Sequence, residues 1–139
     1  RDERGPGLAL VQVSRGTAFG DLDNDGDLDI AVNNSNERPA LLRNDSVVGG
    51  WLGLRLRGAA SNRDAIGARI ALTTGDRTLV REVRRNASYL SSNDPRVLFG
   101  LGDAEVAERV EIRWPSGVIQ VVETLPGRQY VAIEEETSQ

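Results

Sequence analysis

The chain has 139 residues, which is enough for one ordinary domain with a hydrophobic core, or for one domain and part of another. Hydrophobic residues make up 39% and charged residues 27% of the sequence, a balance typical of a globular protein. The net charge is −4, and the absence of cysteine, histidine and lysine excludes disulfides, zinc–thiolate sites, Schiff-base catalysis and histidine as a general base.

The acidic charge is concentrated in the first part of the chain. Residues 1–50 contain nine acidic residues and five arginines, whereas residues 51–139 contain twelve of each. The balanced second part lacks the basic stripe of a nucleic-acid surface, so we expect no nucleic-acid partner. No apolar run reaches about 18 residues, so we expect no membrane span. Neither an initiating Met nor a signal peptide opens the sequence, and we expect the numbering to begin inside a longer or processed polypeptide.

The first fifty residues predict short strands at residues 8–13, 28–32 and 40–45. The second of these is the clearest, because apolar and other residues alternate with the period of two that is typical of a strand. An aspartate-rich loop at residues 21–29 precedes it.

From Trp51 onward, short apolar segments recur at regular spacing and are separated by turns rich in Gly, Asn, Asp and Pro. One helical turn is predicted at residues 103–108. About eight strands at this spacing predict an all-β protein, either a β-sandwich or a closed barrel. We expect the boundary between two parts at residues 45–50, which gives a calcium-loop repeat at residues 1–46 and a β-domain at residues 47–139. The predicted strands of the second part lie at residues 51–56, 66–72, 80–83, 97–101, 110–114, 118–122 and 130–133.

The segment FGDLDNDGDLDIAV, residues 19–32, concentrates five aspartates in nine positions. If Asp21 is position 1, aspartates occupy positions 1, 3, 5, 7 and 9, and Gly26 occupies position 6. Alternating oxygen ligands around a glycine turn are typical of calcium loops. An EF-hand also needs a glutamate at position 12, where this sequence has Val32 in a strand pattern. The sequence therefore predicts a calcium-binding turn between two β-strands.

We expect the carboxylates of Asp21, Asp23, Asp25 and Asp29 to bind the ion, and Asp27 to offer its backbone carbonyl while its side chain faces solvent. Without a cation, these carboxylates repel one another and raise their own pKa values. Magnesium fits less well, because it requires tighter octahedral geometry. The alternative is a solvated acidic turn, since aspartate and glycine are ordinary turn residues. The simplest role for the ion is structural.

The segment GTAFGDLDNDGDLDIAVNN resembles the FG-GAP repeat of integrin-type β-propellers, whose blades carry D-x-D-x-D-G-x-x-D calcium loops. The sequence contains one such repeat, whereas a propeller has about four to eight blades. The resemblance implies that residues 1–46 are the end of an upstream propeller, or a hairpin that leans on the second domain or on a partner chain.

From Trp51 to about Glu135 the chain is similar to the ASPIC/UnbV domain, which follows such repeats in cartilage acidic protein and its bacterial relatives. The matching segments are WLGLRLRG, SNRDAIGARI, REVRRNASYLSSNDPRVLFGLG and VEIRWPSGVIQ. Two positions depart from the family pattern: residues 86–88 replace a Gly-rich stretch, and Leu98 stands where a histidine is frequent. The resemblance implies a secreted or cell-surface protein with an accessory β-sandwich-like domain and no settled activity.

Polar residues in the loops of the second part form another candidate site, because loops gather at the ends of a sandwich and ligands often bind there. The alternative is that Asx turns and an Arg–Asp pair only brace these loops. The candidate residues for binding a ligand or partner are Asn62, Arg63, Asp64, Arg84, Tyr89, Ser91, Asn93 and Asp94.

We expect a calcium-binding extracellular adhesion or interaction module without enzymatic activity, with a protein or glycan partner at the cell surface or in the matrix. One alternative is a structural subunit that self-associates into oligomers or filaments by strand pairing. A carboxylate-based sugar hydrolase would need an acid pair, such as Glu82 and Glu111, across a cleft. A carbohydrate-binding module would require an exposed cluster of the rings of Trp51, Trp114, Tyr89 and Tyr130.

Overall fold

The computed structural model describes residues 11–46, 49–86 and 88–137, and all the regular structure in these ranges is β-strand. No helix in the described ranges has the length and apolar character needed to cross a membrane. The prediction of an all-β protein is confirmed. The strands are β1 (Ser14–Gly20), β2 (Asp29–Asn34), β3 (Ala40–Leu42), β4 (Gly50–Arg57), β5 (Arg69–Thr74), β6 (Arg77–Glu82), β7 (Val97–Gly102), β8 (Val106–Arg113), β9 (Ile119–Pro126) and β10 (Gln129–Glu134).

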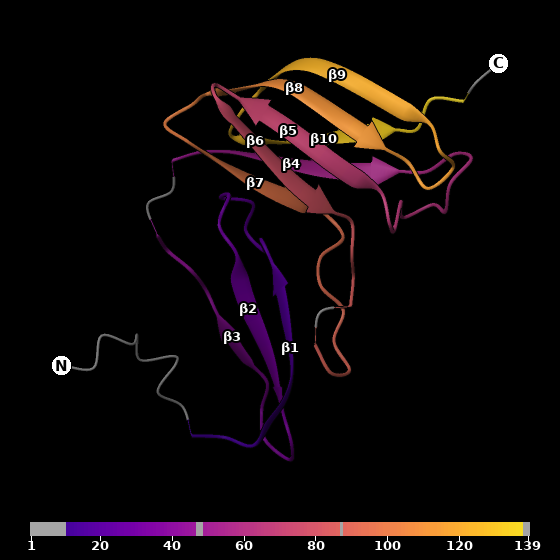
Figure 1. Ribbon diagram of the computed structural model, residues 1–139. Helices are drawn as coiled ribbons and strands as arrows, with labels where there is room; N and C mark the ends of the chain where they lie inside the picture. Colours follow the sequence, from indigo (N-terminus) through magenta and orange to yellow (C-terminus); the bar gives the residue numbers. More distant parts are fainter. Residues whose placement is uncertain (1–10, 47–48, 87, 138–139) are drawn as a thin grey trace.

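The strands form three sheets, as Figure 1 shows. The first is an antiparallel sheet with the order β1-β2-β3. The second has the order β10-β4-β7, with β10 parallel and β7 antiparallel to β4. The third is antiparallel, with the order β6-β5-β8-β9. No sheet of the described residues closes into a barrel, so the sandwich is the predicted architecture that the structure bears out.

One hydrophobic core joins the second and third sheets. On β4, Leu52, Leu54 and Leu56 are buried at every second position. Ile70 on β5 and Ile112 on β8 belong to the same buried cluster on the opposite sheet. Full burial of a side chain of this size stabilises the fold by about 1.5–3 kcal/mol. The alternation seen in the sequence therefore builds the sandwich.

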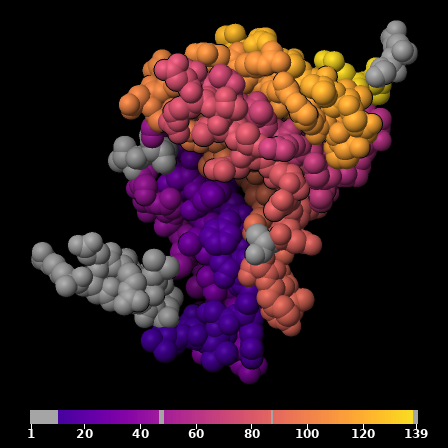
Figure 2. Space-filling model, in the orientation of Figure 1, coloured from indigo at the N-terminus to yellow at the C-terminus, as the bar shows by residue number. Residues whose placement is uncertain are grey.

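The β1-β2-β3 sheet lies beside the sandwich and below it in the view of Figure 1. The connection between β6 and β7 runs down along this sheet, and the space-filling view in Figure 2 shows the two in contact. β1 and β2 are paired from Ser14↔Asn34 to Gly20↔Asp29, so residues 21–28 form the hairpin turn. The prediction that the aspartate loop joins two strands is confirmed.

The first predicted strand, at residues 8–13, is wrong where it can be compared. Residues 8–10 lie outside the described ranges, and Val11 and Val13 precede β1, which begins at Ser14. The physical reason is that the β1–β2 pairing ends where Asn34 meets Ser14; beyond it, the amide of Ser35 donates a hydrogen bond to the carbonyl of Val13, but the regular pairing does not continue. An apolar run without a partner strand remains irregular.

The helical turn predicted at residues 103–108 is also wrong, because β8 begins at Val106. Ala107 is fully buried and pairs with Leu125 on β9. Burial against the sandwich core therefore outweighs the local helix propensity of this segment. The predicted boundary at residues 45–50 covers the end of the connection between β3 and β4 and the first residue of β4, and residues 47 and 48 lie outside the described ranges. The division into two domains stays a prediction.

Glu135 follows β10 and fixes the loop after β4. Its Oε2 accepts hydrogen bonds from the backbone amides of Ala59, Ala60 and Ser61 at distances of 2.7 to 2.9 Å. Its Oε1 accepts hydrogen bonds from the hydroxyls of Ser61 and Ser116. Burial by itself raises the pKa of Glu135, but these hydrogen bonds outweigh it and lower the pKa from 4.5 to about 2.

Glu135→Gln should lower Tm, because an amide nitrogen replaces one of the two acceptor oxygens. Since the pKa of Glu135 is depressed in the folded state, the carboxylate contributes its full stability above pH 4.5 and loses it as the pH falls towards about 2. The difference in Tm between the parent and the variant, followed by circular dichroism, should shrink over this range. Glu136→Gln, at an exposed position, is the control and should melt like the parent. A difference in Tm that is independent of pH would contradict this role.

Candidate metal centre

The aspartate loop turns sharply between β1 and β2. Asn24 and Gly26 have φ angles of 63° and 96°, a region that asparagine and especially glycine adopt at low cost. A Cβ added to Gly26 would lie 2.2 Å from the indole of Trp51, which leaves no room for a side chain. Gly26 is therefore required both by the dihedral angle and by the close approach to β4.

Three carboxylates converge inside this turn. Asp21, Asp23 and Asp29 each have a carboxylate oxygen within 4.8 Å of the other two. Two oxygens that bind one calcium ion at about 2.4 Å lie at most about 4.8 Å apart, so the separation matches a shared ion. Asp21 and Asp29 are buried, whereas Asp23 lies at the solvent side.

Backbone amides hold the two buried carboxylates in place. Asp21 accepts hydrogen bonds from the amides of Asp25 and Gly26 at 3.2 and 2.9 Å. Asp29 accepts hydrogen bonds from the amides of Leu22 and Asn44, both at 2.9 Å. A carboxylate has about four acceptor positions, so each retains capacity for a cation. Hydrogen bonds within the protein therefore hold the carboxylates of Asp21 and Asp29 in position without a bound ion.

Asp25 and Asp27 lie outside this group of three. A carboxylate oxygen of Asp25 accepts a hydrogen bond of 3.1 Å from the backbone amide of Asp27. The prediction that the Asp27 side chain faces solvent is wrong: it is 5% exposed, and neither of its carboxylate oxygens has a hydrogen-bond partner among the described residues. The physical reason is the docking of the turn, because the adjacent Gly26 is covered by Trp51 and this side of the loop faces the sandwich.

The electrostatics of the loop favour a bound cation. Desolvation, followed by repulsion from Asp25 and Asp29, raises the pKa of both Asp23 and Asp27 above 3.8. A divalent ion among these oxygens would reverse the repulsion. The hard carboxylate oxygens of Asp21, Asp23 and Asp29 fit such an ion, and these three residues are the ones placed to hold it.

Residues of the sandwich support the loop from outside. The Tyr130 hydroxyl donates a hydrogen bond of 2.6 Å to Asp21, and burial together with this bond raises the pKa of Tyr130. Arg96 donates hydrogen bonds to the Asp21 carbonyl and to the Asn24 side chain. The Arg96 guanidinium also lies 4.1 Å from the centre of the Tyr130 ring, a cation–π contact. The aspartate loop and the sandwich therefore share one polar cluster.

Part of the predicted loop site contacts the hairpin, where Asn93 and Asp94 line a cavity of about 220 Å³ together with Asp21. Asn93 accepts a hydrogen bond from the amide of Phe19, and the amide of Asp94 donates to the carbonyl of Phe19. Asp94 also forms an ion pair with Arg96 at 2.6 Å. Ser91 lies against Gly16, where an added Cβ would be 2.7 Å from its hydroxyl oxygen.

The remaining loop residues are scattered. The side chain of Asn62 accepts a hydrogen bond from the backbone amide of Ile66 and donates one to the carbonyl of Ile66, so it closes a turn. Asp64 pairs with Arg85 at 3.0 Å, and Arg84 pairs with Glu82 at 2.7 Å. Tyr89 is exposed, and Arg63 lines a cavity beside β4. Three of the eight predicted residues, Arg84, Asn93 and Asp94, thus line one cavity at the hairpin. The other five divide between bracing contacts, the hairpin interface and the cavity beside β4.

The sequence analysis missed Trp51, Arg96 and Tyr130 as partners of the aspartate loop. One signal for Trp51 was present: it is out of phase with Leu52, Leu54 and Leu56, so a strand that buries the leucines directs Trp51 to the opposite face. Arg96 and Tyr130 carry no comparable signal, because their contacts with the loop depend on tertiary structure.

The acid pair proposed for a hydrolase has the wrong electrostatics for a general acid. Hydrogen bonding to Arg84 lowers the pKa of Glu82. Hydrogen bonds from Arg113 and Arg109 lower the pKa of Glu111. A glycosidase acid needs a raised pKa, so neither carboxylate supports that alternative.

The substitution Gly26→Ala tests the packing of the hairpin turn against Trp51. Gly117→Ala is a matched control, since Gly117 has a φ of 94° but nothing within 4 Å of an added Cβ. The control should lose about 1–2 kcal/mol in free energy of unfolding, from the dihedral angle alone. Gly26→Ala should lose about 1–3 kcal/mol more, from the clash with the indole. Equal losses in urea denaturation would contradict the contact.

Comparison with known families matches residues 58–139 to the family described as ASPIC and UnbV. No curated protein matches the chain. The matched region contains β5 to β10, including Arg96 and Tyr130, whereas the aspartate loop lies outside it. Because the match covers more than half of the sequence, the chain belongs to the ASPIC and UnbV family.

Proposed function

We propose that the chain is a calcium-binding extracellular interaction module in which the ion has a structural role. The observation that carries this proposal is the convergence of Asp21, Asp23 and Asp29 within 4.8 Å. The carboxylate of Asp25 and the backbone carbonyl of Asp27 complete the proposed ligand set. The likeness to an FG-GAP repeat supports the same function and a location outside the cell.

The ion would stabilise the hairpin turn by neutralising carboxylates that otherwise repel one another. Its effect would extend to the sandwich, because Asp21 is also hydrogen-bonded to Tyr130 and Arg96. The bound ion would then make the hairpin and its contacts with the sandwich more rigid, and the loops of the module would remain exposed for a partner.

Thermal melts in EDTA, in calcium and in magnesium test the proposal. With free calcium about tenfold above its Kd, the parent should gain about 1.4 kcal/mol, or a few degrees in Tm. Asp23→Asn should lose this gain, yet melt no lower than the parent in EDTA, because repulsion acts on Asp23. Asp76→Asn, in the exposed turn between β5 and β6, is the control and should respond to calcium like the parent.

Two outcomes would contradict the proposed metal site. Calcium at millimolar concentration with no effect on the parent would leave the loop as a solvated acidic turn. A calcium response that persists in Asp23→Asn and in Asp25→Ala would place the ion elsewhere.

Assembly by strand pairing is the second candidate, favoured by exposed apolar side chains on the edge strand of the three-stranded sheet and in the adjoining hairpin turn. Leu22, Leu28 and Leu41 are 58%, 48% and 63% exposed, and Leu41 lies on the edge strand β3. Such an edge is a template for another strand, including a blade of an upstream propeller. Sedimentation over a range of concentrations should then show self-association that Leu41→Lys weakens. A parent that stays monomeric throughout would exclude self-assembly.

Carbohydrate binding by aromatic stacking receives less support. Trp51 and Trp114 are buried, and Tyr130 packs on Trp51 with ring centres 5.2 Å apart. Tyr89 alone of the four rings is largely exposed. A sugar would therefore have to be recognised here by polar and charged groups.

A further inference from the structure

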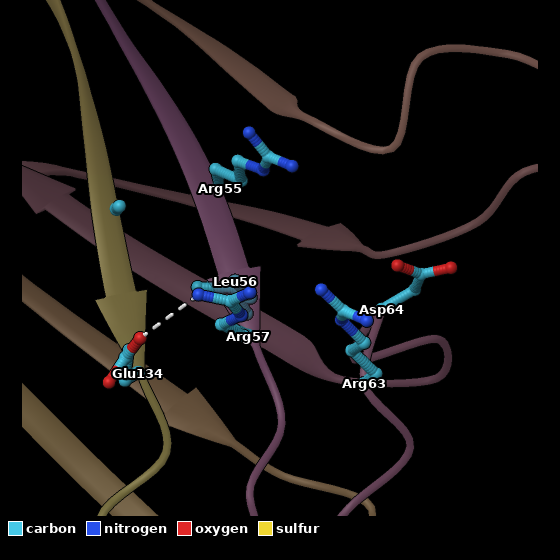
Figure 3. Close-up of a pocket in the computed structure, with 7 residues that line it drawn as sticks. Arg55, Leu56, Arg57, Arg63, Asp64 and Glu134 are labelled. Carbon is cyan, nitrogen blue, oxygen red and sulfur yellow. Dashed lines mark hydrogen bonds and ion pairs between the residues drawn. The ribbon is translucent and has the colours of Figure 1, made fainter.

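A cavity of about 230 Å³ opens on the outer face of the β10-β4-β7 sheet. Figure 3 shows its charged lining: Arg55 and Arg57 come from β4, Glu134 comes from β10, and Arg63 and Asp64 come from the loop before β5. None of these residues belongs to the aspartate loop. The cavity is thus a second polar feature of the molecule, separate from the metal centre.

Two of the three arginines in this cavity are available to a ligand. Arg57 pairs with Glu134 at 3.5 Å, whereas neither Arg55 nor Arg63 forms an ion pair with any of the described residues. Asp64 is paired with Arg85 on its other side. Two guanidinium groups without carboxylate partners, in a chain of net charge −4, form a local site for an anion.

We propose that this cavity binds a carboxylate-bearing sugar unit, of the uronic-acid type, from an acidic polysaccharide. The carboxylate of the sugar would accept hydrogen bonds from Arg55 and Arg63, and its hydroxyls would donate to Asp64 and Glu134. The volume suits one such unit, since pockets for drug-sized ligands begin at about 300 Å³. The inference gives the proposed interaction module a ligand class and rests on that function.

The lining favours a sugar acid over an acidic peptide. The hydroxyls of a sugar acid can donate hydrogen bonds to Asp64 and Glu134, whereas the ionised side chain of a glutamate or aspartate has no hydrogen to donate. The backbone of β4, which supplies Arg55 and Arg57, is already paired with β10 on one side and β7 on the other. The recognition chemistry is therefore carried by side chains.

Titration of the full chain with sodium glucuronate, followed by NMR chemical shifts, tests this proposal. Saturable shifts should appear around the cavity, and Arg55→Gln and Arg63→Gln should each weaken binding about tenfold or more, because each loses a hydrogen bond to a charged group. Arg15→Gln removes an exposed arginine of β1 that does not line the cavity, and should bind like the parent. Glucose, which lacks the carboxylate, should not bind.

Three results would overturn the proposal: no saturable shifts with glucuronate, an equal loss of affinity in Arg15→Gln, or a tetraglutamate peptide that binds as tightly as glucuronate. All titrations are run both in EDTA and in calcium. Glucuronate binding in both conditions, without any effect of calcium on Tm, would refute the metal site and keep the sugar site. A calcium-dependent Tm without glucuronate binding would do the reverse.

Discussion

The strand β4 uses both of its faces, and the rest of the structure depends on this double use. On one face, Leu52, Leu54 and Leu56 enter the core of the sandwich. On the other face, Trp51 covers Gly26 of the hairpin turn, and the Tyr130 ring lies where a side chain on Gly53 would be. The same eight-residue strand thus contributes to the apolar core and provides the surface against which the hairpin packs.

This constraint explains how a three-stranded sheet persists beside the sandwich. A small sheet buries too little apolar surface to be stable alone, and several of its large side chains remain exposed. Its contacts with the sandwich are mainly polar: Tyr130 and Arg96 hold the turn, and Asn93 with Asp94 holds the end of β1. The acidic turn is therefore both the candidate metal centre and part of an internal interface.

The sequence predicted the sandwich well, because alternation on strands such as β4 and β8 arises from the same burial that forms the core. It also placed the turn of the hairpin, since Asp21 to Asp29 carry a local pattern. It failed at residues 103–108, where local propensity and core burial disagree. It also failed for the side chain of Asp27, whose burial depends on Trp51 and not on its neighbours in the loop. The contacts of Arg96 and Tyr130 had no local signature.

The parallel pairing of β10 with β4 has a consequence for the order of folding. The central strand of its sheet lacks one neighbour until the last strand has been synthesised. Tyr130 and Asp21 are 109 positions apart in the sequence, so the loop acquires this partner late. Contacts of such long range slow folding. During synthesis on the ribosome, the aspartate turn therefore emerges well before β10, the strand that carries its partner Tyr130.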